Sequence, residues 1–234
     1  MLMTLIVVLV VSAALMLGAA WGVYGHMSDR LEGFLIALAG GALMLSLVSE
    51  LVEPAIEQSG LLLATAGVAV GSAVFTGVDY LIDEKWGPDS GGGLLAAISL
   101  DGIPENLALG VALIGAGPMG VAALAGSIFL SNLPEAAGGA KQMTDNGNRS
   151  KGRIVAIWAA TAAVLSVAAI LGNVLLAGVA PQWLSFIRCL AAGAVVASLA
   201  TEVFPKAFRQ DHHLAGLATA MGLVLALVLG GLGG

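Results

Sequence analysis

The segments ISLDGIPENLALG (98–110) and IFLSNLPEAAGGA (128–140) resemble each other, and each places Pro-Glu inside a long apolar run. A carboxylate at the centre of a bilayer costs about 3 kcal/mol or more, so such acids are rare and mark functional sites. Asp101 and Glu105 are four residues apart, as are Ser131 and Glu135. On a helix this spacing places both members of a pair on one face, so the two segments can direct polar side chains at a common ligand.

The composition is that of an integral membrane protein. Of the 234 residues, 59% are hydrophobic and 10% are charged, and the mean hydropathy is +0.99. Soluble domains have about 25% charged residues. The net charge of −6 argues against a nucleic-acid partner. No nucleophile with a neighbouring base, phosphate-binding loop or haem ligand pair is visible in the sequence, so we expect neither an enzyme nor a cofactor.

Apolar runs of about 20 residues, the length that crosses a bilayer, predict an all-α protein with eight transmembrane helices. Short connections between the runs predict a single domain over residues 1–234. The predicted helices cover approximately 2–23, 34–57, 60–83, 92–114, 118–141, 153–177, 183–207 and 213–232.

The basic residues predict the orientation of these helices. Eight of the nine fall in or beside the first, third, fifth and seventh connections, and Arg188 is the exception. Because positive loops stay in the cytoplasm, both termini are expected on the extracellular or periplasmic side. The eight residues are Arg30, Lys85, Lys141, Arg149, Lys151, Arg153, Lys206 and Arg209.

An internal repeat relates the second and seventh predicted helices. Aligning Glu50 with Glu202 sets GGALMLSLVSELVEPA (40–55) against AGAVVASLATEVFPKA (192–207). These two helices are expected to run in opposite directions, which predicts an inverted 3+2+3 repeat: helices one to three mirror helices six to eight around a central pair. Transporters commonly have this design, with the substrate bound at the midplane where the repeats meet.

The two central prolines suggest what the site binds. Pro104 and Pro134 cannot donate a hydrogen bond to the carbonyl four residues earlier, so each helix gains a backbone oxygen in need of a partner. A cation can supply that partner, and oxygen-bearing side chains surround both prolines. The candidate metal ligands are Asp101, Glu105, Asn106, Ser131, Asn132 and Glu135.

At these residues the chain resembles the ZIP (Zrt/Irt-like) family of divalent metal transporters, bacterial-type. The resemblance rests on Pro-Glu in both central helices, LVEPA in the second and Glu-x-x-Pro in the seventh, here EVFP (202–205). It implies transport of zinc, manganese, iron(II), cadmium or a similar ion, as substrate rather than cofactor, toward the cytoplasm by alternating access. It also implies that Glu105 and Glu135 are the metal-bridging acids, and it places the protein in the cytoplasmic (inner) membrane of a bacterium.

The chain departs from the family pattern at several ligand positions. Asp101 stands where the fourth-helix histidine is usual, Gly102 replaces an asparagine, and Asn106 replaces a glycine. We therefore expect one metal ion rather than two. An all-oxygen site weakens the preference for zinc and favours manganese, iron(II) or magnesium-like cations.

Other acids in apolar segments are candidates for the ion pathway. Glu50 and Glu202 are equivalent in the repeat and are expected to form entry and exit steps, unless they bond hydroxyl groups on neighbouring helices. Glu53 lies near the face of Glu50, and Asp79 approaches the cytoplasmic end of the third helix. A cation or proton channel, a metal exporter and a transport-inactive metal sensor or scaffold all remain open. The small-residue helix faces are compatible with a homodimer and equally with a monomer.

Overall fold

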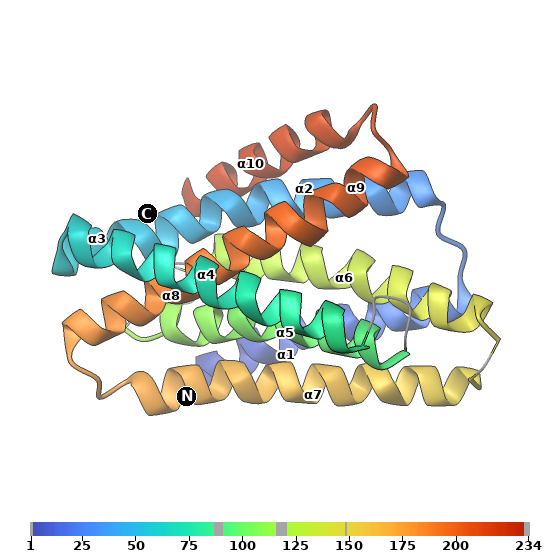
Figure 1. The fold of residues 1–234 in the computed structure, drawn as a ribbon, viewed down its shortest axis with the longest axis horizontal. Helices are drawn as coiled ribbons and strands as arrows, with labels where there is room; N and C mark the ends of the chain where they lie inside the picture. The colour runs from blue at the N-terminus through green and yellow to red at the C-terminus, as the bar shows by residue number, and fades with distance from the viewer. Residues whose placement is uncertain (1, 87–90, 116–120, 148, 232–234) are drawn as a thin grey trace.

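The computed structural model describes residues 2–86, 91–115, 121–147 and 149–231, and every regular element in these ranges is helical. The helices lie roughly along one long axis and form an elongated bundle (Figure 1). The elements are α1 (Leu2–Tyr24), α2 (Asp29–Leu47), η1 (Val48–Val52), α3 (Glu53–Ser59), α4 (Leu61–Trp86), α5 (Gly91–Ala112), α6 (Ala122–Asp145), α7 (Lys151–Leu176), α8 (Pro181–Ser198), η3 (Leu199–Val203), α9 (Phe204–Gln210) and α10 (Ala215–Gly231).

A helical segment lies in each of the eight predicted ranges, but the boundaries differ where capping sets them. The second helix begins at Asp29 instead of residue 34, because the Ser28 side chain caps it by accepting a hydrogen bond from the Leu31 backbone N–H at 3.3 Å. Capping of this kind satisfies backbone donors that the first turn of a helix leaves free. The apolar run therefore underestimates the length of the helix.

Five helical segments in the described residues are long and apolar enough to cross a membrane. They are Thr4–Tyr24, Asp29–Ser59, Leu61–Ile82, Lys151–Leu176 and Pro181–Gln210. The helix α10 is apolar but shorter, at 17 residues. The Pro-Glu helices α5 and α6 are not among the five, and in α6 the polar residues of the predicted site lower the apolar content. The chain thus has the helices of an integral membrane protein.

Two long helices contain a π-helical turn at equivalent places. In the first, η1 separates α2 from α3 and contains Glu50; in the second, η3 separates α8 from α9 and contains Glu202. Pro54 and Pro205 follow the two turns and cannot donate to the carbonyls of Glu50 and Thr201, so the regular hydrogen-bond ladder is interrupted there. Such π turns occur frequently at functional sites.

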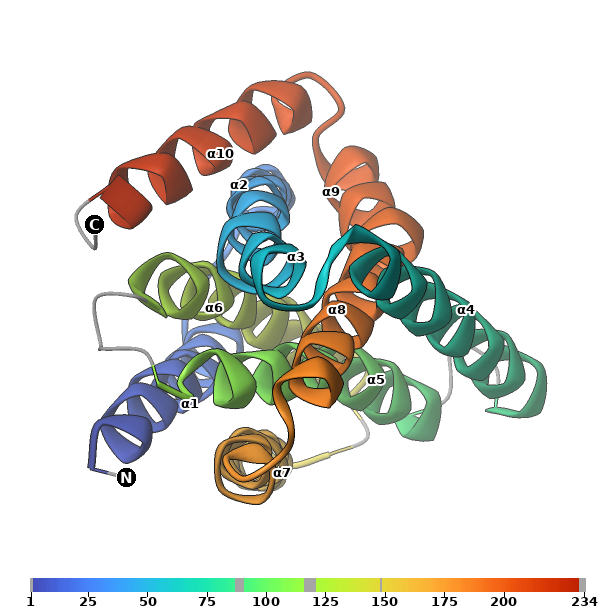
Figure 2. The ribbon, with the colours of Figure 1, turned by 90° about the vertical axis from the view of Figure 1, so that its left-hand side faces the viewer.

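The contacts between helices show the same pairing of two halves as the sequence repeat. The pairs α1–α6, α2–α10, α2–α6 and α2–α9 have as counterparts α7–α5, α8–α4, α8–α5 and α8–α3. In the end view, α10 lies against α2 and α4 lies against α8 on the outside of the bundle (Figure 2). Exchanging α1 with α7, α2 with α8, α3 with α9, α4 with α10 and α5 with α6 therefore preserves these pairs.

Four glycines make very close contacts between α2 and α10 and between α8 and α4, and they occur in equivalent pairs. A Cβ atom on any of them would collide with a backbone carbonyl of the neighbouring helix, so only glycine permits the observed approach. Positions 38 and 41 of α2 match positions 190 and 193 of α8 in the register that aligns Glu50 with Glu202. The contacts join Gly41 to Thr219, Gly222 to Leu38, Gly193 to Val68, and Gly71 to Leu190.

Candidate metal site

The Pro-Glu motifs lie on α5 and α6, which contact each other inside the bundle. Both helices continue through their prolines, so Pro104 and Pro134 interrupt the hydrogen-bond ladder without ending either helix. Around α5 and α6 lie α1, α2, α7 and α8, which supply the apolar core. The predicted ligands are therefore carried by the two helices that the other helices enclose.

Most predicted ligands with described side chains are buried. The Glu105 side chain is on a residue only 6% exposed, and Asn106, Ser131 and Asn132 are also buried. Glu135 is half-buried. Asp101 belongs to α5, but its side chain lies outside the described part of the chain. A carboxyl group as buried as that of Glu105 requires a compensating partner.

Both asparagines use their amide nitrogens for backbone hydrogen bonds. Asn106 Nδ2 donates to the Gly102 carbonyl at 2.9 Å, and Asn132 Nδ2 donates to the Val11 carbonyl at 3.5 Å. The first bond stays within α5, whereas the second joins α6 to α1. Each asparagine could then bind a metal ion only through its side-chain oxygen, since an amide N–H is a donor.

Leu165 of α7 occupies the space beside Gly102. A Cβ atom at Gly102 would lie 2.6 Å from Leu165 Cδ1, and Leu165 itself is buried. An asparagine, which the family pattern has at this position, would need Leu165 to move. An isobutyl group cannot act as a metal ligand, so this neighbour adds no oxygen or nitrogen ligand beside Gly102. Leu165 could not be predicted from the sequence, because the contact depends on how α7 packs against α5.

Glu50 caps the start of α6. Its Oε1 atom accepts a hydrogen bond from the Leu124 backbone N–H at 2.8 Å, and Leu124 is the third residue of that helix. A carboxylate is favourable there because the helix N-terminus carries partial positive charge. The Oε2 atom of Glu50 is buried without a hydrogen-bond partner. Glu50 thus links the π turn η1 to the helix that carries Glu135, and its partner is a backbone N–H, not one of the hydroxyl groups that the structural alternative named.

The remaining predicted pathway acids lie in three different elements. Glu202 is half-buried in η3, Glu53 is exposed at the start of α3, and Asp79 is half-buried on α4. The described residues contain no group of three or more His, Cys, Asp or Glu side chains close enough to bind one ion. The Asp101 side chain is not among the described ones, so this statement does not cover it. Among the candidate ligands with described side chains, Glu105 and Glu135 are the two acids, and the others are neutral oxygen-bearing groups.

No protein-family model and no curated protein matches the chain. The resemblance to metal transporters accordingly rests on the Pro-Glu pair, the repeat and the residues around them.

One ion pair of the described residues, with a buried acid, was not predicted from the sequence. Glu32, in the first turn of α2, is bonded to Lys206 of α9 at 3.0 Å, and its side chain is only 5% exposed. A Cβ atom at Gly138 of α6 would collide with Glu32 Oε1, so the carboxylate lies directly on the α6 backbone. Close by, Lys141 of α6 pairs with Asp29 at 2.8 Å. These charges join α2, α6 and α9, and no local pattern could have paired residues so distant in sequence.

Proposed function

We propose that this protein transports divalent metal cations across a membrane. Eight membrane-crossing helices, arranged as an inverted 3+2+3 repeat with both termini outside the cytoplasm, would carry one ion site between α5 and α6. The observation that carries the proposal is that two helices in contact at the centre of an apolar bundle each contain Pro-Glu at matching positions, with Glu105 buried. Acids kept at such a cost are retained for binding a cation or moving it.

The ligand chemistry supports a hard or borderline divalent ion. The candidate ligands are carboxylates, a hydroxyl and amide oxygens, with no histidine or cysteine in either Pro-Glu segment. Carboxylate and carbonyl ligands suit manganese and magnesium, while imidazole and thiolate favour zinc. We therefore place manganese and iron(II) ahead of zinc in the expected order. Leu165 beside Gly102 supports one bound ion.

Alternating access would use the paired halves of the bundle. The glycine contacts join α2 to α10 and α8 to α4, which makes two closely packed units. Helix α6 contacts α1 and the first unit, and α5 contacts α7 and the second unit. Rocking of one unit against the other would expose the site to each side in turn. Clustered carboxylates do not all ionise without a cation, so metal binding should release protons and uptake should depend on pH.

The test is metal uptake into proteoliposomes that contain the wild type, Glu105→Gln or Glu135→Gln. Zinc, cadmium, manganese, iron(II), cobalt and magnesium are compared at two pH values. Glu57→Gln removes an exposed acid from α3 and serves as the control. Saturable uptake that both site variants abolish and the control retains would support the proposal. Flux that does not saturate would indicate a channel, and uptake unaffected by either variant would refute the site.

One observation favours the transport-inactive sensor as a second candidate. Asn106 and Asn132 both donate through Nδ2 to backbone carbonyls, which holds their side-chain oxygens in place, as in a site that binds an ion without moving it. A sensor would bind metal by isothermal titration, lose that binding in Glu105→Gln, and show no uptake of any metal.

A further inference from the structure

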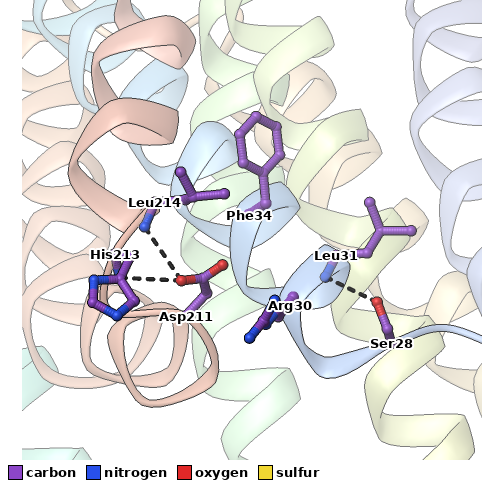
Figure 3. Close-up of a pocket in the computed structure, with 7 residues that line it drawn as sticks. All are labelled: Ser28, Arg30, Leu31, Phe34, Asp211, His213 and Leu214. Atoms are coloured by element: carbon purple, nitrogen blue, oxygen red, sulfur yellow. Dashed lines mark hydrogen bonds between the residues drawn. The ribbon is translucent and has the colours of Figure 1, made fainter.

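A pocket of about 440 Å³ lies at the end of the bundle where α2 begins and where the chain turns from α9 into α10 (Figure 3). Its polar side is formed by Ser28, Arg30, Asp211 and His213, which lie in the turns or the first helical residues. Its apolar side is formed by Leu31, Phe34 and Leu214. None of these residues belongs to the candidate metal site.

The helix ends fix the depth of this pocket in a membrane. The apolar span Asp29–Ser59 begins beside it, and the span Pro181–Gln210 ends beside it. Phe34, a lining residue, lies five residues inside α2, which is about 7.5 Å deeper at 1.5 Å per residue. Leu214 completes the apolar side. In a membrane crossed by these spans, the pocket would lie at headgroup level, with Phe34 on its deeper side.

The pocket carries one positive and one negative group that do not neutralise each other directly. In the described residues, neither Arg30 nor Asp211 takes part in an ion pair, and the Arg30 side chain is exposed. Asp211 is only 7% exposed, and its Oδ1 atom accepts backbone hydrogen bonds from His213 at 3.1 Å and Leu214 at 3.3 Å. These bonds hold the carboxylate in place at the turn before α10.

We propose that this pocket binds the headgroup of phosphatidylethanolamine. The phosphate would lie on the Arg30 guanidinium, the primary ammonium would donate to the Asp211 carboxylate, and the acyl chains would pass along Leu31 and Phe34. Guanidinium binds phosphate strongly, and an ammonium–carboxylate contact is a charge-assisted hydrogen bond. The inference needs only that the protein lies in a membrane, so it stands or falls independently of metal transport.

Other ligands fit these groups less well. A phosphatidylglycerol headgroup has no cation for Asp211, and a choline headgroup has no N–H to donate to it. A divalent metal ion would face the positive charge of Arg30 and would find one carboxylate among the described lining residues, whereas such ions take about six or more oxygen ligands. A zwitterionic lipid whose cation carries N–H groups complements the Arg30 guanidinium, the Asp211 carboxylate and the apolar side of the pocket.

Native mass spectrometry of the delipidated full chain, titrated with dioctanoyl phosphatidylethanolamine, phosphatidylcholine or phosphatidylglycerol, tests the proposal. The wild type should bind one phosphatidylethanolamine about tenfold more tightly than either other lipid, the effect of one charge-assisted hydrogen bond. Asp211→Asn keeps an acceptor for the turn and should remove this preference. Arg30→Gln should weaken all three lipids about tenfold, whereas Arg209→Gln, an exposed arginine of α9 outside the pocket, should change nothing.

Two further arms decide the source of the ligand and the integrity of the fold. Soluble glycerophosphoethanolamine has the same headgroup but no chains, so it should bind at least tenfold more weakly than the dioctanoyl lipid. Thermal unfolding of Asp211→Asn should match that of the wild type. Equal affinity for the three lipids in the wild type, unchanged binding in Arg30→Gln, or zinc binding at the pocket that Asp211→Asn removes would each overturn the proposal.

Discussion

Gly71 of α4 should be far less tolerant of alanine than Gly77, six residues further along the same helix. A Cβ atom at Gly71 would collide with the Leu190 carbonyl of α8, whereas a Cβ atom at Gly77 has no atom within 4 Å. Overpacking of this kind costs about 1–3 kcal/mol, because a helix must move away from its neighbour. Alanine at an open helix position gains up to about 1 kcal/mol from helix propensity. The two variants should therefore differ by about 2–4 kcal/mol.

The free energy of unfolding, measured by denaturant titration in one detergent, checks this difference. Gly222→Ala on α10 should lose about as much as Gly71→Ala, roughly 1–3 kcal/mol, because it meets the Leu38 carbonyl in the equivalent contact. Gly230→Ala, which has open space, is the control on α10. Equal stability of Gly71→Ala and Gly77→Ala would refute the close approach of α4 to α8. A loss at Gly71 without one at Gly222 would refute the equivalence of the two contacts.

Three further predictions concern single contacts. Glu50→Ala should lower the free energy of unfolding by about 0.5–2 kcal/mol, because α6 loses its cap. Glu50→Gln keeps an acceptor and should keep the stability. A drop in metal uptake by Glu50→Gln at unchanged stability would instead assign Glu50 to the pathway. Lys206→Met should destabilise the protein by about 1–3 kcal/mol, less than a fully buried pair because Lys206 is 38% exposed, and Glu32→Gln in the same chain should restore part of that loss in a thermal unfolding assay. Gly102→Asn should destabilise the protein, because the new side chain clashes with Leu165. Adding Leu165→Ala should relieve the clash and raise the number of bound metal ions, counted by elemental analysis, from one to two. Absence of a second ion would show that Leu165 does not limit the site.

The sequence predicted the helices because long apolar runs report membrane-length segments directly. It also paired Glu50 with Glu202, and the structure has a π turn at both positions. The pairing was visible because residues on both sides of the two acids match in the same register, Ser46 with Ser198 and Ala55 with Ala207. Helix ends were less accurate, because the Ser28 cap extends α2 into polar sequence that a hydropathy argument assigns to a loop.

The contacts around the candidate site could not be predicted in the same way. Leu165 beside Gly102 and the Val11 carbonyl beside Asn132 both depend on which helices become neighbours. The partner of Glu50 is a backbone N–H at a helix start, and every helix offers such groups, so composition gives no hint of it. An acid in an apolar helix indicates that the structure supplies it with a partner, but it does not identify that partner.

The equivalence of the two halves also shows where they differ. In the register of the repeat, Glu32 and Lys206, which form the buried ion pair, match Leu184 and Pro54. One half therefore holds its α2–α9 contact with charge, and the equivalent α8–α3 contact has no charge at those two positions. The strength of an ion pair depends on the cations and protons around it, whereas apolar contacts respond to neither. The glycine contacts are common to both halves, whereas the Glu32–Lys206 pair is not, so salt and pH should affect the α2–α9 contact more than the equivalent α8–α3 contact at these positions.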